Sequence, residues 1–233
     1  MADDSPGKEL RLALTMSASG VIGGILAGAN PVESLASGLA PVAVQAAVAI
    51  RTHWVNKSTR SIEVAADRMG VGVDIVLERS LAYEDRLELL ARVIEASARS
   101  TIPEKVEALG KVLADGLQED GDTAEALILA RALEALDGPH VVVLDHLERI
   151  RLPPPELLDV RHIGVTGWQV PVIAQALPDL ADVMEPLVAT LSGTGLLRDN
   201  TGVNYSSQPG PEAWVITPTG SRCLFLLDSD EPS

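Results

Sequence analysis

LALTMSASGVIGGILAGANPVESLASGLAPVAVQAAVAI, at residues 12–50, contains two apolar segments joined by a short polar turn. The turn is NPVES at residues 30–34, and its Pro31 suits the end of one helix and the start of another. Neither apolar segment contains a charged residue. The pattern predicts an apolar, Gly/Ala-rich helical hairpin within residues 1–60.

Glycines recur at a regular spacing in the first arm of this hairpin, residues 12–29. Gly20, Gly24 and Gly28 lie four residues apart and would form one flat face of a helix. In lipid, this spacing lets two helix backbones approach closely, so it is typical of membrane oligomers. Inside a soluble protein, the same face would pack against another helix. The arm is near the lower length limit for a helix that spans a bilayer.

The second arm, residues 35–50, is shorter and contains Pro41. A proline is tolerated in the first turn of a helix, so Pro41 suits either a return arm or the start of a buried helix. Trp54 follows among basic residues, a combination that membrane interfaces favour. A position in the protein core is the alternative for Trp54. The basic residues on the two sides of the hairpin are Lys8, Arg11, Arg51, Lys57 and Arg60.

The chain has a net charge of −15, but this charge is unevenly distributed. Residues 1–60 contain four acidic and five basic side chains, which leaves 29 acidic and 13 basic side chains for residues 61–233. An acidic body repels nucleic acid and anionic surfaces. The apolar, slightly basic N-terminal part is therefore the part that we expect to meet a membrane.

Cysteine usage and the first residues bear on the compartment. The single cysteine, Cys223, excludes an intramolecular disulfide and favours a reducing compartment. Asp3, Asp4 and Glu9 outnumber the basic residues before the first apolar segment, which argues against a secretory signal peptide. The expected location is the cytoplasm, with the hairpin at the inner face of the cell membrane.

Residues 61–137 are predicted to form an acidic helical bundle. Apolar residues recur at helical spacing within residues 84–99, which predicts an amphipathic helix. Asp74 is expected to cap the helix that follows it in the chain. The sequences TIPE at residues 101–104 and DTAE at residues 122–125 predict the starts of two further helices.

The C-terminal part, residues 138–228, alternates helices with short strands. Helices are predicted at residues 140–150, 169–177 and 179–192, strands at 195–198 and 213–217 on the two sides of a polar stretch at 200–211, and a helix or strand at 218–227. This order resembles a winged-helix domain, with residues 229–233 as a disordered tail. The predicted fold class is mainly α, with an apolar N-terminal helical hairpin, a helical bundle and a C-terminal winged-helix-like α+β domain.

Winged helices often bind DNA through the helix before the first strand of the wing. In this sequence, that helix carries Asp179, Asp182 and Glu185 and no lysine or arginine. Residues 138–233 contain 12 acidic residues against five arginines and no lysine. Because phosphate neutralisation supplies much of DNA affinity, we expect this helix to bind a protein partner instead.

Motifs for catalysis or metal binding are absent from the sequence. It contains no HExxH, no GxSxG and no P-loop, and the acidic run at residues 119–122 lacks the ligand spacing of a calcium loop. We expect no enzymatic activity and no catalytic, cofactor-binding or metal-binding residues.

Three leucine-periodic segments carry a resemblance to a known family. They are LELLARV at residues 87–93, KVEALGKVLADG at 105–116 and LEALDGPHVVVL at 133–144. With the winged-helix-like end, they are similar to bacterial proteins of the abortive-infection alpha family. The resemblance implies a role in phage defence without known catalytic residues. The glycine-rich hairpin has no counterpart in that pattern.

Three functions are compatible with these features. The first is a non-enzymatic, membrane-associated interaction or effector protein, whose hairpin inserts or docks and whose winged helix binds protein. The second is a soluble oligomeric scaffold in which the hairpin is buried. The third is a winged-helix DNA-binding regulator. A homo-oligomer is expected in the first two cases, because the glycine face would mediate self-association.

Overall fold

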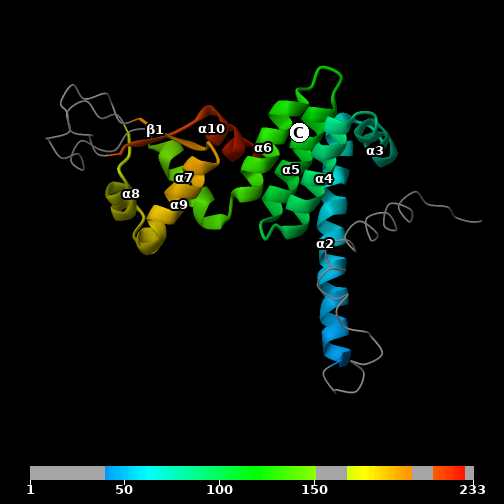
Figure 1. The fold of residues 1–233 in the computed structure, drawn as a ribbon, viewed down its shortest axis with the longest axis horizontal. Coiled ribbons are helices and arrows are strands. Elements are labelled where there is room, and N and C mark those ends of the chain that lie inside the picture. The colour runs from blue at the N-terminus through cyan, green and yellow to red at the C-terminus, as the bar shows by residue number, and fades with distance from the viewer. Residues whose placement is uncertain (1–39, 151–166, 201–211, 229–233) are drawn as a thin grey trace, which may run out of the picture.

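Two groups of helices make up the computed structural model, which describes residues 40–150, 167–200 and 212–228, with only the backbone given for 40–48. Over these residues the protein is mainly helical, with nine α-helices, one 3₁₀-helix and a two-stranded sheet, which confirms the mainly α class. The first group ends before residue 138, and the second follows it (Figure 1). The predicted first hairpin arm, the polar stretch before the second strand and the tail lie outside the described residues.

Helix α2 (Ala40–Met69) is the longest described element, with 30 residues and a length of about 45 Å. It begins one residue before Pro41, at a position where the missing N–H of proline costs no helical hydrogen bond. The helix passes without a break through residues 60 and 61, where the sequence suggests a boundary between hairpin and bundle. Its N-terminal part extends well beyond the other helices of its group (Figure 1).

Four more helices complete the bundle. They are α3 (Val73–Leu81), α4 (Glu84–Arg99), α5 (Pro103–Leu117) and α6 (Thr123–Ala135). Helix α5 packs against α2, α4 and α6, so it is the central helix. Its sequence is correspondingly apolar on several faces, and Val106, Leu109 and Leu113 are almost completely buried.

The helix starts agree with the sequence signals only in part. The carboxylate of Asp122 accepts a hydrogen bond from the Glu125 N–H at 3.0 Å, which confirms the predicted cap of α6. The predicted cap by Asp74 is wrong, because Gly72 is the N-cap and Asp74 lies inside α3. The predicted capping box at residues 101–104 is also wrong, because Ile102 occupies the N-cap of α5.

The C-terminal group contains short helices around a small sheet. Its elements are α7 (Gly138–Arg149), α8 (Val170–Ala176), the 3₁₀-helix η4 (Pro178–Val183), α9 (Met184–Gly193), β1 (Leu197–Asp199), β2 (Trp214–Ile216) and α10 (Pro218–Leu227). The two strands are antiparallel, with Leu197 opposite Ile216. Trp168 forms two backbone hydrogen bonds of 2.8 Å with Trp214, on the other side of β2.

One helix predicted at residues 179–192 is split into η4 and α9. The cause is Pro186, which lacks the N–H that a continuous α-helix would direct at the Asp182 carbonyl. The turn before α9 is therefore the tighter 3₁₀ type.

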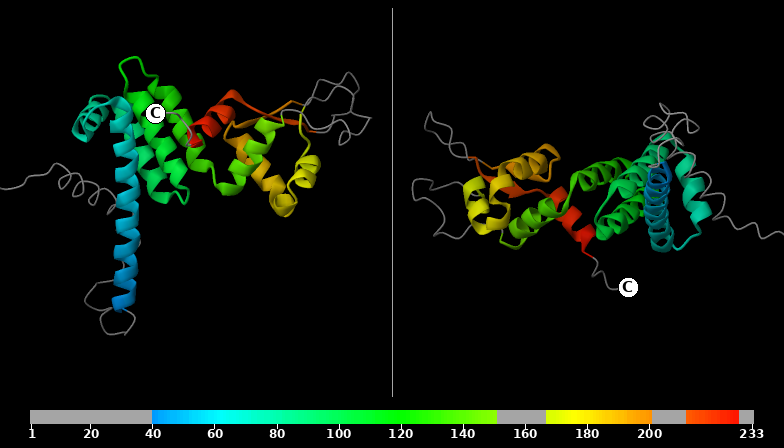
Figure 2. Two further views of the ribbon diagram at one scale, coloured as in Figure 1. Left: turned by 180° about the vertical axis from the view of Figure 1, so that it is seen from behind. Right: turned by 90° about the horizontal axis from the view of Figure 1, so that it is seen from below.

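Helix α10 joins the two groups. It follows β2 and packs against α5, α6 and α7, and Figure 2 shows it lying between the bundle and the C-terminal helices. Cys223, Leu226 and Leu227 are its buried side chains at this junction. The last described helix therefore links the C-terminal group to the core of the bundle.

Among the described helices, none combines the length and apolar character that crossing a bilayer requires.

Candidate functional site

Helix α2 leaves the bundle at a definite point. The ammonium group of Lys57 donates to the carbonyl of Ser100, and the Ser58 hydroxyl donates to the Ile94 carbonyl at 3.1 Å. Both acceptors lie near the C-terminal end of α4, so this end of α4 marks the edge of the bundle. From Ser58 onward, α2 buries a regular set of side chains that includes Ile62 and Ala65.

The turn of α2 before this edge is exposed to water. The five consecutive residues 49–53 are all exposed, and Ile50 keeps 50% of its surface accessible. Five residues turn through about 500°, more than one full circuit of the helix, so exposed residues occur on every face of this turn. Trp54, the predicted interface anchor, is half-buried just after the turn. We call residues 49–53 the exposed turn.

Only some of the predicted hairpin residues lie within the described part of the chain. Gly20, Gly24, Gly28 and Pro31 lie outside the described residues, so the predicted glycine face stays a prediction. Pro41 is the second residue of α2, as expected for the start of a helix. Within α2, the backbone thus connects the apolar sequence before Ile50 directly to the bundle.

The predicted partner-binding residues lie together on the surface of the C-terminal group. Asp179 and Asp182 belong to η4, Glu185 is in the first turn of α9, and all three side chains are exposed. Residues 167–193 contain no lysine, arginine or histidine. Within the described residues, none of the three carboxylates forms an ion pair. Over the described residues, this surface is therefore acidic.

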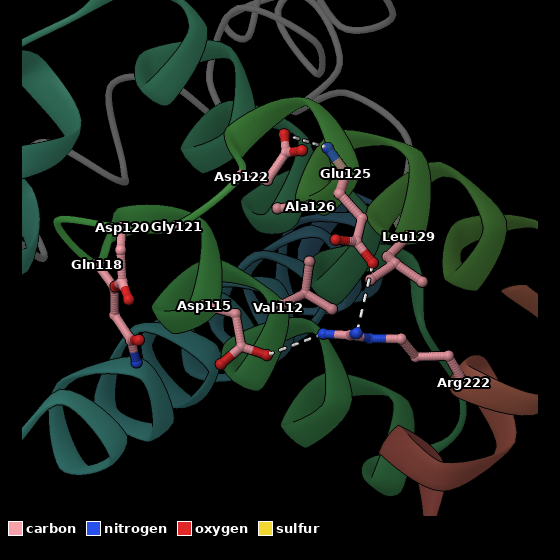
Figure 3. Close-up of a pocket in the computed structure, with 10 residues that line it drawn as sticks. All are labelled: Val112, Asp115, Gln118, Asp120, Gly121, Asp122, Glu125, Ala126, Leu129 and Arg222. Carbon is pink, nitrogen blue, oxygen red and sulfur yellow. Dashed lines mark hydrogen bonds and ion pairs between the residues drawn. The ribbon is translucent and has the colours of Figure 1, made fainter.

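A shallow pocket of about 290 Å³ lies between the α5–α6 turn and α10. Figure 3 shows Arg222 entering it from α10 and facing the bundle. Its guanidinium lies 3.9 Å from Asp115 Oδ2 and 3.4 Å from Glu125 Oε1. The sequence does not reveal this site, because Arg222 is about a hundred residues from the carboxylates that it contacts. The arrangement pairs α10 with the bundle, and the residues that line the pocket include no serine, threonine, cysteine, lysine or histidine.

We expect Arg222→Ala to have a small effect, because its ion pairs are about half exposed to water. The free energy of unfolding should fall by about 0.5–1 kcal/mol, and the loss should shrink at high salt. Chemical denaturation at low and high salt measures both. A loss several times larger would show that the guanidinium is the main contact between α10 and the bundle.

The joint between the two groups contains a buried lysine that the sequence does not single out. Lys105 on α5 is only 4% exposed and donates to the carbonyls of Glu134 (2.8 Å) and Leu136 (2.6 Å) at the end of α6. Burial lowers the pKa of Lys105, and the nearby carboxylates of Asp137 and Glu134 oppose this change. Next to it, His140 Nδ1 accepts from the Asp137 N–H and completes the capping box of α7.

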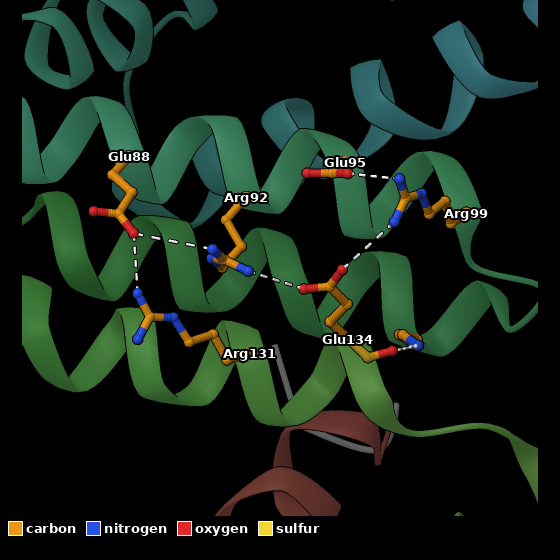
Figure 4. A network of polar contacts seen from close by, with 7 residues as sticks. Glu88, Arg92, Glu95, Arg99, Arg131 and Glu134 are labelled. Carbon is orange, nitrogen blue, oxygen red and sulfur yellow. Dashed lines mark hydrogen bonds and ion pairs between the residues drawn. The ribbon is translucent and has the colours of Figure 1, made fainter. Parts of the chain in front are cut away.

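An ion-pair network covers the outer face of α4 and α6 (Figure 4). Arg92 and Glu134 are 3.1 Å apart, and Glu88 and Arg131 are 3.0 Å apart. Arg99 pairs with Glu95 at 2.7 Å and approaches Glu134 at 4.0 Å. These side chains are partly exposed and paired with one another, so the network holds two helices together and offers no free charge of one sign.

The remaining reactive groups are enclosed. Burial raises the pKa of Cys223 to about 12, so its thiol is protonated and unreactive at neutral pH. His146 packs edge-on against Trp168 with ring centres 5.0 Å apart. No group of acidic, histidine or cysteine side chains with the geometry of a metal site occurs in the described ranges.

Comparison with known proteins found no matching family model, no similar curated protein and no similar solved structure. The resemblance to the abortive-infection alpha family therefore stays a prediction.

Proposed function

We propose that this protein is a membrane-associated interaction protein that docks through the start of α2 and the apolar sequence before it. The observation that supports this proposal is the exposed turn at residues 49–53, which stands clear of the bundle. The sequence from Ala40 to Ile50 has no charged residue, and Arg51, His53 and Lys57 follow it. An apolar helix end followed by cations and a tryptophan is typical of a segment that enters a bilayer interface.

The charge distribution of the body fits the same orientation. The acidic residues are concentrated after residue 60, and anionic lipid headgroups would repel them. Helix α2 separates the two regions, because its first 17 residues precede the edge of the bundle at Lys57. The spacing of about 25 Å exceeds the Debye length of about 8 Å at physiological salt, so the repulsion is largely screened.

We further propose that the C-terminal group is a winged-helix-like module that binds protein. The order α7, Trp168, α8, α9, β1 and β2, with Trp168 paired beside β2, supports this topology. The exposed carboxylates of Asp179 and Asp182 on η4 and of Glu185 in the first turn of α9 precede β1, where a winged helix would have its recognition helix. They favour a partner with basic residues and disfavour DNA.

A vesicle experiment tests the membrane proposal. We expect the full-length protein to sediment with vesicles of mixed zwitterionic and anionic phospholipid, and Ile50→Asp to weaken binding by at least ~10-fold, because it places a charge on the exposed turn. Val142→Asp is the matched control, since Val142 is a similarly exposed apolar residue on α7. A wild-type protein that stays in the supernatant would contradict the proposal and support the soluble scaffold.

The phage-defence role implied by the family resemblance is part of this proposal. It is tested by comparing phage plating on bacteria that produce the wild-type protein or the Ile50→Asp variant. Protection that is equal for both would separate defence from membrane docking, and protection that is absent for both would contradict the defence role.

A further inference from the structure

The junction between α3 and α4 exposes three large apolar side chains within seven residues. Leu81 is 67% exposed, Tyr83 63% and Leu87 44%. Leu81 ends α3, Tyr83 precedes α4, and Leu87 lies one turn further, with its N–H donating to the Tyr83 carbonyl at 3.0 Å. We call these three residues the elbow. Water-exposed apolar clusters of this kind are typical of interaction sites.

Folding alone does not account for Tyr83. It is the N-cap residue of α4, a position where Ser, Thr, Asp or Asn would accept a hydrogen bond from the first turn. The tyrosine side chain forms no such bond, and the only ring contact recorded for it among the described residues is with the Arg86 guanidinium, 5.2 Å from the ring centre. A residue that weakens its own helix start and remains exposed suggests a role outside the folded chain.

The rim of the elbow carries charges of both signs. Glu78 and Arg79 lie on the last turns of α3, and Glu84 opens α4. In the described part of the chain, none of these three side chains forms an ion pair. A rim of unpaired carboxylates and a guanidinium selects neither a purely basic nor a purely acidic partner, but it complements a second copy of itself.

We propose that the elbow is the contact surface of a two-fold symmetric dimer of this protein. In such a dimer the same patch faces itself, so the carboxylates of one copy meet the arginines of the other. The centre would contain tyrosine and leucine, and Arg86 stacked on Tyr83 fits the composition of interface hot spots. The elbow lies beside α3, on the side of the bundle away from the C-terminal group in all views (Figures 1 and 2). A second copy can therefore approach without meeting that group.

The expected dimer is weak. Three large apolar side chains and a short charged rim correspond to a small interface, for which dissociation constants on the order of micromolar are usual. The contact is separate from the membrane-docking segment, because the elbow lies at the α3–α4 junction beside the C-terminal end of α2, whereas the exposed turn precedes the part of α2 that packs in the bundle (Figure 1).

The first test is sedimentation of the full-length protein and of Tyr83→Ser across micromolar concentrations. We expect the dimer dissociation constant to rise at least ~10-fold. The Tm should stay unchanged or rise by about 2–4 °C, because serine is a better N-cap, so lost dimerisation cannot be attributed to unfolding. Phe225→Ser is the matched control, because Phe225 is 62% exposed on α10, and it should leave the dimer unchanged.

The second test is site-specific cross-linking. Leu81→Cys should form a disulfide-linked dimer on mild oxidation, because a two-fold axis through the elbow brings equivalent residues together, whereas Phe225→Cys should not. A wild-type protein that is monomeric at all concentrations, or a Tyr83→Ser variant that associates like the wild type, would overturn the proposal. Loss of vesicle binding by Tyr83→Ser with unchanged association would also overturn it and assign the elbow to the membrane.

Discussion

Gly110→Val is expected to lower the free energy of unfolding by about 3 kcal/mol and the Tm by roughly 10 °C. A Cβ atom at this position would lie 2.5 Å from the Ser61 carbonyl oxygen and 2.7 Å from the Val64 Cβ. The Ser61 oxygen belongs to the backbone of α2, and the Val64 Cβ is bonded directly to that backbone. Neither atom can therefore rotate away as the end of a long side chain would. Valine would therefore push α2 away from α5, its most extensive packing partner.

Thermal unfolding followed by circular dichroism measures this effect, and Gly193→Ala is the control. Gly193 ends α9, and a Cβ there would meet nothing within 4 Å, so the alanine variant should be as stable as the wild type. If Gly110→Val were also as stable, the close packing of α2 on α5 would be wrong. The exposed turn would then not be held at a fixed distance from the bundle.

Local hydrogen bonds explain why the sequence predicts some helix starts correctly and others incorrectly. The bond between Asp122 and the Glu125 N–H joins residues three positions apart, so the pattern is visible in the sequence. At residues 101–104 the same kind of pattern is misleading. The Ser100 hydroxyl interacts there with the backbone of Ile102, and the helix starts one residue later than the threonine would require.

The candidate site, too, can be predicted from the sequence only in part. The apolar sequence up to Ile50 and the cations after it are visible in the sequence, and they lead directly to the membrane hypothesis. The point where α2 leaves the bundle is not visible, because it depends on contacts of Ser58 and Lys57 with residues 36 and 43 positions away. Neither Gly110 nor Arg222 is distinctive without knowledge of what lies opposite it in the fold.

The second large effect is expected at Lys105. Lys105→Met keeps an unbranched side chain of similar length but removes the donor to the Glu134 and Leu136 carbonyls. These carbonyls lie at the end of α6, where helical partners are missing, so the substitution leaves buried acceptors unsatisfied. Relief from burying a charge offsets part of the loss. We expect a net decrease of about 2–4 kcal/mol in the free energy of unfolding at pH 7.

The pH dependence distinguishes this explanation from a simple loss of packing. Burial lowers the pKa of Lys105 below 10.5, so the unfolded chain binds more protons than the folded one between the two pKa values. The charged lysine therefore weakens the wild type at all pH values below its folded pKa, and this penalty is relieved as pH rises to 10.5. Because methionine does not titrate, the stability difference between wild type and variant should widen over that range. Denaturant titrations between pH 7 and 10.5 measure it, and a constant difference would show that the ammonium group is not desolvated at the joint.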